Sequence, residues 1–298
     1  MKKNLIIGGV MLDIVMQLER LPRTGEDIYA KSQDMTVGGC AYNVADIQKH
    51  FQVPYTLLAP IGTGIYADMI RKKLEQAGHE SPIHSEAGDN GYCLCMVEAD
   101  GERTFLTLPG IECRFEKEWF AQVDGAEYDS VYICGYEIEG EGGEAIIEFL
   151  EENRHLHVYY APGPRICQIK KERHERILML HPVLHLNEGE ALQFTGKEHY
   201  EKAAEQLFEE CGNVVMITLG ERGSYLYQSG MGELIPSQKA QVVDTIGAGD
   251  SHIGAVIALR SKGKDCREAV ALANQVSAVV VGVQGPTLTE DKFRKGDW

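Results

Sequence analysis

The chain has 298 residues, of which 44% are hydrophobic and 25% are charged, a composition typical of a globular protein with a large core. Its formal net charge of −16 argues against nucleic acid and against an anionic membrane surface as partners. The eight cysteines include no C-x-x-C pair, so neither a zinc site nor a disulfide framework is indicated, and we expect reduced thiols in a cytoplasmic protein.

The first predicted element is a buried strand near the N-terminus. Leu5-Ile6-Ile7 is a short apolar run followed by Gly8-Gly9, and no cleavage site of a signal peptide accompanies it. No apolar stretch of the chain is long enough to cross a bilayer, so a membrane is not expected as a partner.

Two separate segments predict short antiparallel strands. Residues 14–36 carry Pro22, Gly25 and alternating stretches, which suit strands better than a helix. In the second segment, residues 92–97 and 103–108 are rich in strand-forming residues and flank an Asp-Gly turn, which predicts a hairpin.

Between these segments we expect a helix up to about His50, a strand over 55–61 and a helix over 66–77. The glycines of Gly62-Thr63-Gly64 are not followed by Gly-Lys-Ser/Thr, so a P-loop is excluded. From residue 130 onward, strand-like runs at 131–134, 157–160, 183–187 and 214–219 alternate with helical ones. This alternation predicts an α/β fold with a doubly wound, mostly parallel sheet and helices on both faces.

The segment from Asp244 to Asp250 is the most informative part of the sequence. Gly247-Ala248-Gly249 allows a tight turn that opens a helix over 251–260, where unpaired N–H groups and the helix dipole favour a phosphate. Asp250, in the first turn, can take a proton from an attacking hydroxyl. The alternative is a plain strand-to-helix loop, which the two flanking aspartates make less favourable. A second helix over 266–281 begins after Asp265, a suitable cap.

The segment Asp244–Asp250 resembles the DTxGAGD motif of the ribokinase-like (PfkB) family of sugar and nucleoside kinases. The family's GGxxxN, NxxE and TxGxxG motifs are matched at 38–43, 187–190 and 218–223, so the resemblance covers nearly the whole chain. It implies a core of residues 1–13, 37–83 and 114–298, and a small β-sheet lid of residues 14–36 and 84–113.

The resemblance also implies an acceptor site. Asp13 and Asn43 would bind the hydroxyls of the substrate, and Gly38 and Gly39 would let it approach closely. Arg103 would reach the substrate from the lid. Each has a simpler alternative: Asp13 as a solvated carboxylate, Asn43 as a helix cap and Arg103 as an exposed cation on a strand.

Catalytic and nucleotide roles follow from the same resemblance. Asp250 would be the general base and Gly247, Ala248 and Gly249 the anion hole. ATP would be held by Asn187, Thr218, Gly220, Gly223 and Asn274. Mg²⁺ would be held near Asn187 and Glu190, and a K⁺-like ion near Asp244, Ile246 and the loop 282–286. The alternatives are a helix cap for Asn187 and Glu190, and a plain tight turn for Gly220 and Gly223.

Some positions depart from the family pattern. Met11 and Cys40 stand where ribokinases tend to have Asn and Lys, so ribose is disfavoured as the substrate. Ala161 stands where the family commonly has Asp or Asn, so the usual substrate contact of that loop is not expected. Glu137 or Glu139 is an alternative contact with the pocket. His252, at a position where relatives usually have Phe, is expected to be packed and neutral.

The sequence therefore predicts an ATP-dependent kinase that transfers the γ-phosphate to a hydroxymethyl group of a sugar. A nucleoside kinase with the same chemistry is the first alternative, and a sugar-sensing protein without catalysis is the second. The identity of the acceptor and of the reacting hydroxyl stays open. An exposed lid sheet makes a homodimer through the lid an expectation.

Overall fold

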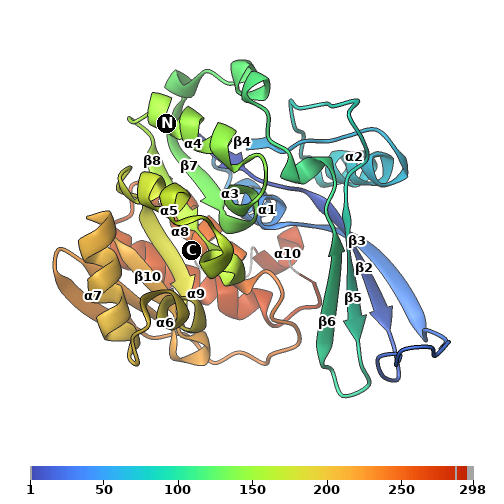
Figure 1. Cartoon of the computed structure of the whole chain (residues 1–298). Helices are drawn as coiled ribbons and strands as arrows, with labels where there is room; N and C mark the ends of the chain where they lie inside the picture. Colours follow the sequence, from blue (N-terminus) through green and yellow to red (C-terminus); the bar gives the residue numbers. More distant parts are fainter. Residues whose placement is uncertain (1, 286, 294–298) are drawn as a thin grey trace.

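The computed structural model describes residues 2–285 and 287–293, so Pro286, in the loop expected near a K⁺-like ion, lies outside the described residues. Within them the chain forms a large sheet covered by helices and a small sheet that stands to one side of it (Figure 1). The two sheets alternate along the chain, because strands of the small sheet lie between strands of the large one.

The large sheet has eight strands in the order β12-β11-β10-β9-β8-β7-β1-β4. Their bounds are β1 Lys3–Ile7, β4 Tyr55–Leu58, β7 Tyr128–Cys134, β8 His157–Ala161, β9 Val183–Asn187, β10 Val215–Thr218, β11 Ser224–Gln228 and β12 Met231–Ile235. In this sheet the neighbouring strands β4, β1, β7, β8, β9 and β10 pair in parallel. The pairings of β10 with β11 and of β11 with β12 are antiparallel. The predicted doubly wound, mostly parallel sheet is confirmed.

Helices pack on both faces of this sheet, which explains why its strands are apolar throughout. Side chains of β1 alternate between the faces: Ile6 belongs to one core cluster, and Leu5 and Ile7 belong to the other. The first cluster includes residues of α1 (Cys40–His50), α2 (Ile65–Ala77), α8 (Ala248–Ser261), α9 (Cys266–Val280) and α10 (Glu290–Phe293). The second includes residues of α3 (Gly135–Glu139), α4 (Gly143–Glu152), α5 (Lys171–Leu178), α6 (Glu188–Thr195) and α7 (Tyr200–Cys211).

The small sheet has the order β3-β2-β5-β6, with β2 Met11–Gln17, β3 Ser32–Gly38, β5 Tyr92–Val97 and β6 Arg103–Leu108. We call these four strands and the turns that join β2 to β3 and β5 to β6 the lid. The strands β5 and β6 are antiparallel, as the Asp-Gly turn predicts, whereas β2 and β5 pair in parallel. The sheet begins at Met11 and ends its second strand at Gly38, so it takes in a few residues on either side of 14–36.

Some boundaries differ from the predicted ones for local reasons. Strand β4 ends at Leu58 rather than Ile61, since Pro60 has no N–H to donate to a ladder. Helix α8 begins three residues earlier than expected, at Ala248. Helix α2 ends at Gly78 in the left-handed conformation, as predicted. All eight cysteines are free, and no helix of the described chain is long and apolar enough to cross a membrane.

Candidate active site

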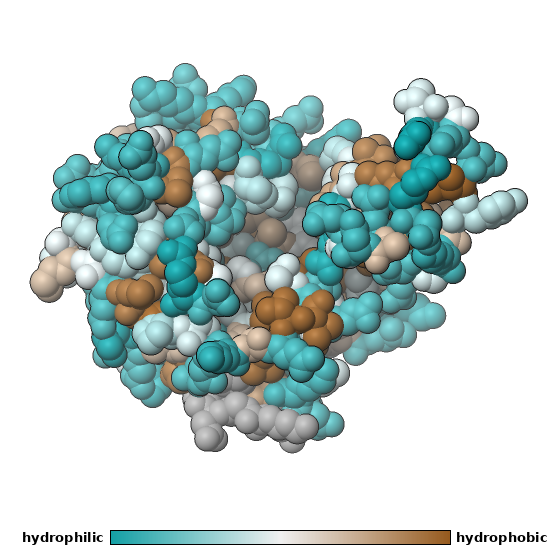
Figure 2. Space-filling view, turned by 90° about the horizontal axis from the view of Figure 1, so that it is seen from below, coloured by the Kyte–Doolittle hydropathy of each residue, from teal (hydrophilic) through white to brown (hydrophobic). Residues whose placement is uncertain are grey.

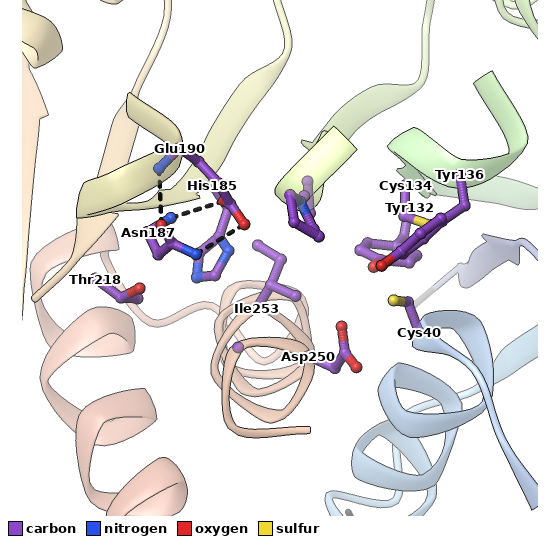
Figure 3. A pocket seen from close by; sticks show the side chains of 14 residues that line it. Cys40, Tyr132, Cys134, Tyr136, His185, Asn187, Glu190, Thr218, Asp250 and Ile253 are labelled. Carbon is purple, nitrogen blue, oxygen red and sulfur yellow. Dashed lines mark hydrogen bonds between the residues drawn. The ribbon is translucent and has the colours of Figure 1, made fainter. Parts of the chain in front are cut away.

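The candidate site lies at the carboxyl edge of the parallel strands, where α/β folds commonly bind ligands. Four strands each contribute their last residue to one cavity: Cys134, Ala161, Asn187 and Thr218. Gly249 and Asp250, at the start of α8, complete this cavity (Figure 3). Its volume of about 150 Å³ suits the reacting groups of two substrates rather than both substrates entire. In the space-filling view the surface is hollowed between the lid and the rest of the molecule (Figure 2).

The turn before α8 presents backbone amides to the cavity. Gly247 is the N-cap with φ 73°, a left-handed conformation that suits glycine, and the first intrahelical bond runs from Ser251 N to Gly247 O at 2.8 Å. Within residues 2–285 and 287–293, the N–H groups of Gly247, Gly249 and Asp250 donate to no acceptor. Ala248 N donates to Thr245 O over a long 3.3 Å. Three of the four amides are therefore free to bind an anion.

Asp250 points into the cavity beside these amides (Figure 3). Its Oδ2 accepts a hydrogen bond of 2.8 Å from Asn43 Nδ2. Burial raises the pKa of the Asp250 carboxyl, while hydrogen bonds from Asn43 and Cys40 act in the opposite direction. A carboxylate with a raised pKa accepts a proton more readily than an exposed carboxylate does.

Asn43 joins the predicted acceptor site to Asp250. The side chain is 5% exposed, and its Oδ1 has no hydrogen-bond partner among the described residues. A buried amide oxygen without a donor is unfavourable, so this oxygen is suited to accept from a substrate hydroxyl. Asn43 lies inside α1, with its N–H bonded to Gly39 O, so it does not cap the helix.

The two glycines before α1 are needed for close packing. A Cβ at Gly38 would lie 1.8 Å from Asp13 Oδ2, so glycine leaves the space that the carboxylate occupies. Gly39 has φ 110°, and a Cβ there would lie 2.5 Å from Gly9 O. Burial raises the pKa of Asp13 to about 6. Asp13 is therefore a partly desolvated carboxylate rather than the solvated one of the simpler interpretation.

Asn187 and Glu190 form a capping box at the start of α6. Asn187 Oδ1 accepts from Glu190 N at 2.8 Å, and Glu190 Oε2 accepts from Asn187 N at 2.9 Å. Both residues also line the cavity, and burial together with the charge of Asp250 raises the pKa of Glu190. The arrangement therefore serves the helix cap and also places a carboxylate near the free amides.

The predicted nucleotide residues are divided between the cavity and its surroundings. Thr218 lines the cavity. Gly220 and Gly223 lie in the turn after β10, with φ 61° and 102°. Asn274 is 4% exposed and belongs to a buried network, where Nδ2 donates to Ile235 O and Oδ1 accepts from Ser224 Oγ. Contact between the Asn274 side chain and adenine would have to compete with these internal bonds.

His252 belongs to the same network. Its Nε2 lies 3.1 Å from Asn274 Oδ1, and its Nδ1 lies 3.0 Å from Nε2 of His185, which lines the cavity. Burial lowers the pKa of His252 to about 4, so the ring is neutral at physiological pH, in agreement with the prediction. No described contact joins His252 to Asp250.

Arg103 and Asp244, 141 residues apart, are brought together. Arg103 Nη1 donates to Asp244 Oδ1 at 2.9 Å, and Asp244 is 7% exposed. Asp244 does not line the cavity that contains Asn187 and Glu190. Of the residues predicted near metal ions, Asn187 and Glu190 thus line the cavity, whereas Asp244 lies outside it.

Several cavity residues were not predicted. Tyr132, Cys134, Tyr136 and His185 line it, and the buried hydroxyl of Tyr132 has no partner within the described part of the chain. Cys134 could have been predicted, because it ends a predicted parallel strand and ligands bind at that edge of such a sheet. Glu137, held open as a pocket contact, is not among the residues that line this cavity; it accepts from Gly9 N at 2.7 Å and from Cys134 Sγ at 2.7 Å.

Comparison with known sequences gives a consistent result. The family model described as pfkB family carbohydrate kinase matches residues 1–292. An Escherichia coli K12 protein named uncharacterized sugar kinase YegV is 35% identical over 285 residues, covering 94% of this chain and 89% of that protein. A ribokinase of Arabidopsis thaliana is 26% identical over 307 residues, covering 96% of this chain and 78% of that protein.

Solved structures share the fold. A ribokinase of Thermotoga maritima superimposes with a TM-score of 0.86 at 23% identity, covering 99% of each chain. A nucleoside kinase of Methanocaldococcus jannaschii superimposes with a TM-score of 0.80 at 22% identity, covering 99% of this chain and 97% of the other. At such identities the likeness is one of fold, and it includes kinases named for sugars and for nucleosides.

Proposed function

Because this chain belongs to the pfkB family of carbohydrate kinases, we propose that it transfers the γ-phosphate of ATP to a hydroxymethyl group of a sugar. The observation that carries this proposal is the Asp250 carboxylate, which Asn43 fixes at 2.8 Å beside three free backbone amides. A base and an anion-binding turn at one point are what phosphoryl transfer to an alcohol requires.

In the proposed reaction, Asp250 takes the proton of the acceptor hydroxyl as its oxygen attacks the γ-phosphorus. The N–H groups of Gly247, Gly249 and Asp250 donate to the oxygens of the transferring phosphoryl group, and the N-terminal dipole of α8 adds positive potential. These groups are fixed before the reaction, so they stabilise the transition state without reorganisation. Most of the rate enhancement should come from this electrostatic part.

The residues at the start of α6 fit Mg²⁺ bound together with phosphate oxygens. No group of three or more His, Cys, Asp or Glu side chains within the described residues is placed to hold a metal ion. Mg²⁺ commonly binds through one or two carboxylates, waters and substrate phosphates, and Glu190 offers such a carboxylate at the cavity. When bound there, Mg²⁺ would neutralise phosphate charge.

The acceptor side of the site favours a sugar other than ribose. Asp13 and Asn43 Oδ1 offer hydrogen-bond acceptors for hydroxyls, whereas Cys40 brings a thiol where a lysine would bring a charge. The Tyr136 ring also lines the cavity and is 44% exposed, and this specific observation supports a nucleoside as the second candidate acceptor, because a flat base can stack on an exposed ring.

The test of catalysis is Asp250→Asn, which keeps the size of the side chain and one oxygen that can accept from Asn43 but removes the base. We expect kcat to fall by about 10²- to 10⁴-fold, while sugar binding, followed by thermal shift, persists. Asp27→Asn, at an exposed lid position, is the control and should keep full activity. Turnover unchanged in Asp250→Asn would exclude the proposed mechanism, and sugar binding by a wild-type protein without turnover would support the sensor.

We also propose a homodimer formed through the lid. Strand β6 is an edge strand, and its Phe105, Leu106 and Leu108 side chains are more than half exposed. An apolar edge strand is favourable for pairing with a second copy of the same edge.

A further inference from the structure

Arg103 connects the lid with the segment that precedes the free amides. It is the first residue of β6, next to the hairpin turn, and its guanidinium is paired with Asp244 at 2.9 Å. The Arg103 side chain is 27% exposed and that of Asp244 is 8% exposed. A largely desolvated carboxylate needs a positive partner, and within the described residues Arg103 is the cation that contacts it.

The Asp244 carboxylate also fixes two loops. Oδ1 accepts from Ile246 N at 2.9 Å, and Oδ2 accepts from Gly285 N at 3.1 Å. The N–H groups of Val243 and Asp244 both donate to Val281 O. This carboxylate thus joins the entry of the amide turn, which begins at Gly247, to the segment that follows α9. Whether a cation neutralises the Asp244 carboxylate should therefore affect the position of the backbone amides in the turn.

A K⁺-like ion was the cation that the family resemblance implied for this loop, and the residues present do not fit it. An ion held by the backbone carbonyls near Asp244 and Ile246 would lie beside the Asp244 carboxylate, which already carries a guanidinium at 2.9 Å and two N–H donors. Two cations beside one carboxylate repel each other, because their separation is short and the site is largely desolvated. Arg103 supplies the charge without any ion.

We propose that the Arg103 guanidinium takes the place of a monovalent cation at Asp244, so that the amide turn is held in position without K⁺. Because the guanidinium is carried by the lid, the pair also ties the lid to the segment that leads into the turn. Arg103 is then a positioning residue that acts through Asp244. The inference rests on the proposed role of the turn in phosphoryl transfer.

The first test needs no catalysis. Thermal unfolding is measured at equal ionic strength in KCl, NaCl and tetramethylammonium chloride, for the wild type, Arg103→Ala and Arg103→Lys. We expect equal melting temperatures in all three salts for the wild type and for Arg103→Lys. Arg103→Ala should melt at a lower temperature, with a partial recovery in KCl or in millimolar guanidinium chloride and none in tetramethylammonium chloride.

The second test measures phosphoryl transfer under the same conditions. Arg103→Ala should lose about tenfold or more in kcat/KM and regain several-fold with K⁺ or guanidinium, since one partner of a desolvated pair has been removed. Arg20→Ala is the matched control, because Arg20 is an exposed lid arginine paired with Glu26. It should show no dependence on the cation.

Two results would overturn the proposal: activation or stabilisation of the wild type by K⁺ relative to tetramethylammonium, or an Arg103→Ala protein as stable as the wild type in every salt. If Arg103→Ala does not fold, the cation dependence of the wild type and of Arg103→Lys decides. If the salt pattern of melting is found but no acceptor is phosphorylated, the cation replacement stands and the proposed function fails.

Discussion

At the scale of single residues, the site depends on close approaches that only particular side chains allow. Asp13 occupies the space that a Cβ at Gly38 would take, and Asn43 holds Asp250 with one end of its amide and leaves the other end free. The sequence could predict these residues from their motifs. It could not predict that Asp13 and Gly38 would be in contact, because this contact depends on the register of β2 and β3, in which Gly38 is the partner of Met11.

The desolvation of Asp13 predicts that its carboxylate lowers the stability of the fold while it contributes to acceptor binding. Since burial raises its pKa from 3.8 to about 6, the folded state binds the proton more tightly than the unfolded state. The cost of the buried charge is absent below about pH 4, grows as the pH rises to about 6, and is constant above that. Asp13→Asn should therefore raise the free energy of unfolding by roughly 2–3 kcal/mol at neutral pH and weaken acceptor binding.

Urea denaturation of Asp13→Asn at pH 4 and at pH 7.5 measures this effect. The gain should be confined to the higher pH. The exposed Asp27→Asn serves as a control that changes neither value. An equal change at both pH values would mean that packing, and not the buried charge, sets the stability of this position.

At the scale of elements, most of the fold was predictable because the local patterns agree with the architecture. The apolar runs of β7 to β10, the Asp-Gly turn of the lid hairpin and the left-handed Gly78 at the end of α2 were all readable in the sequence. The pairing of Arg103 with Asp244 was not, because it joins two elements 141 residues apart. Nor could the sequence distinguish a metal site from a capping box at the start of α6, since both need Asn and Glu at this spacing.

Glu190→Gln distinguishes the two roles of α6. Glutamine at the third helical position can still complete the capping box, so the melting temperature should stay within about 2 °C of the wild type. Losing the carboxylate should raise the Mg²⁺ concentration needed for half-maximal activity by about tenfold. A magnesium titration at fixed ATP measures it. An unchanged requirement for Mg²⁺ would leave Glu190 as a helix cap alone.

At the scale of the whole molecule, the lid offers a surface for self-association. In the space-filling view, hydrophobic side chains gather on the lid side of the molecule (Figure 2). Leu106 and Leu108 project from the same face of β6 and are 60% and 54% exposed. Two copies that each carry a net charge of −16 repel each other, so a specific apolar edge is needed for them to associate.

The proposed dimer is tested by light scattering after size exclusion. The wild type should have twice the mass of the chain, and Leu106→Glu should be a monomer, because a charge on the apolar edge would be buried in the pair. Met179→Glu, at a 61% exposed position at the end of α5, should remain a dimer. A wild-type protein that is monomeric at all concentrations would contradict the proposal.

Two groups of residues in the proposed site come from different parts of the chain: those that would recognise the acceptor and those that would hold the phosphate. Asp13 and Asn43 lie within the first fifty residues, whereas Asn187, Thr218 and the amide turn lie beyond residue 186. During evolution, the choice of acceptor can therefore drift while the phosphate-handling part is inherited unchanged. The pair of Arg103 and Asp244 limits this freedom, since a recombinant that exchanged one half alone could lose one partner of this hydrogen bond.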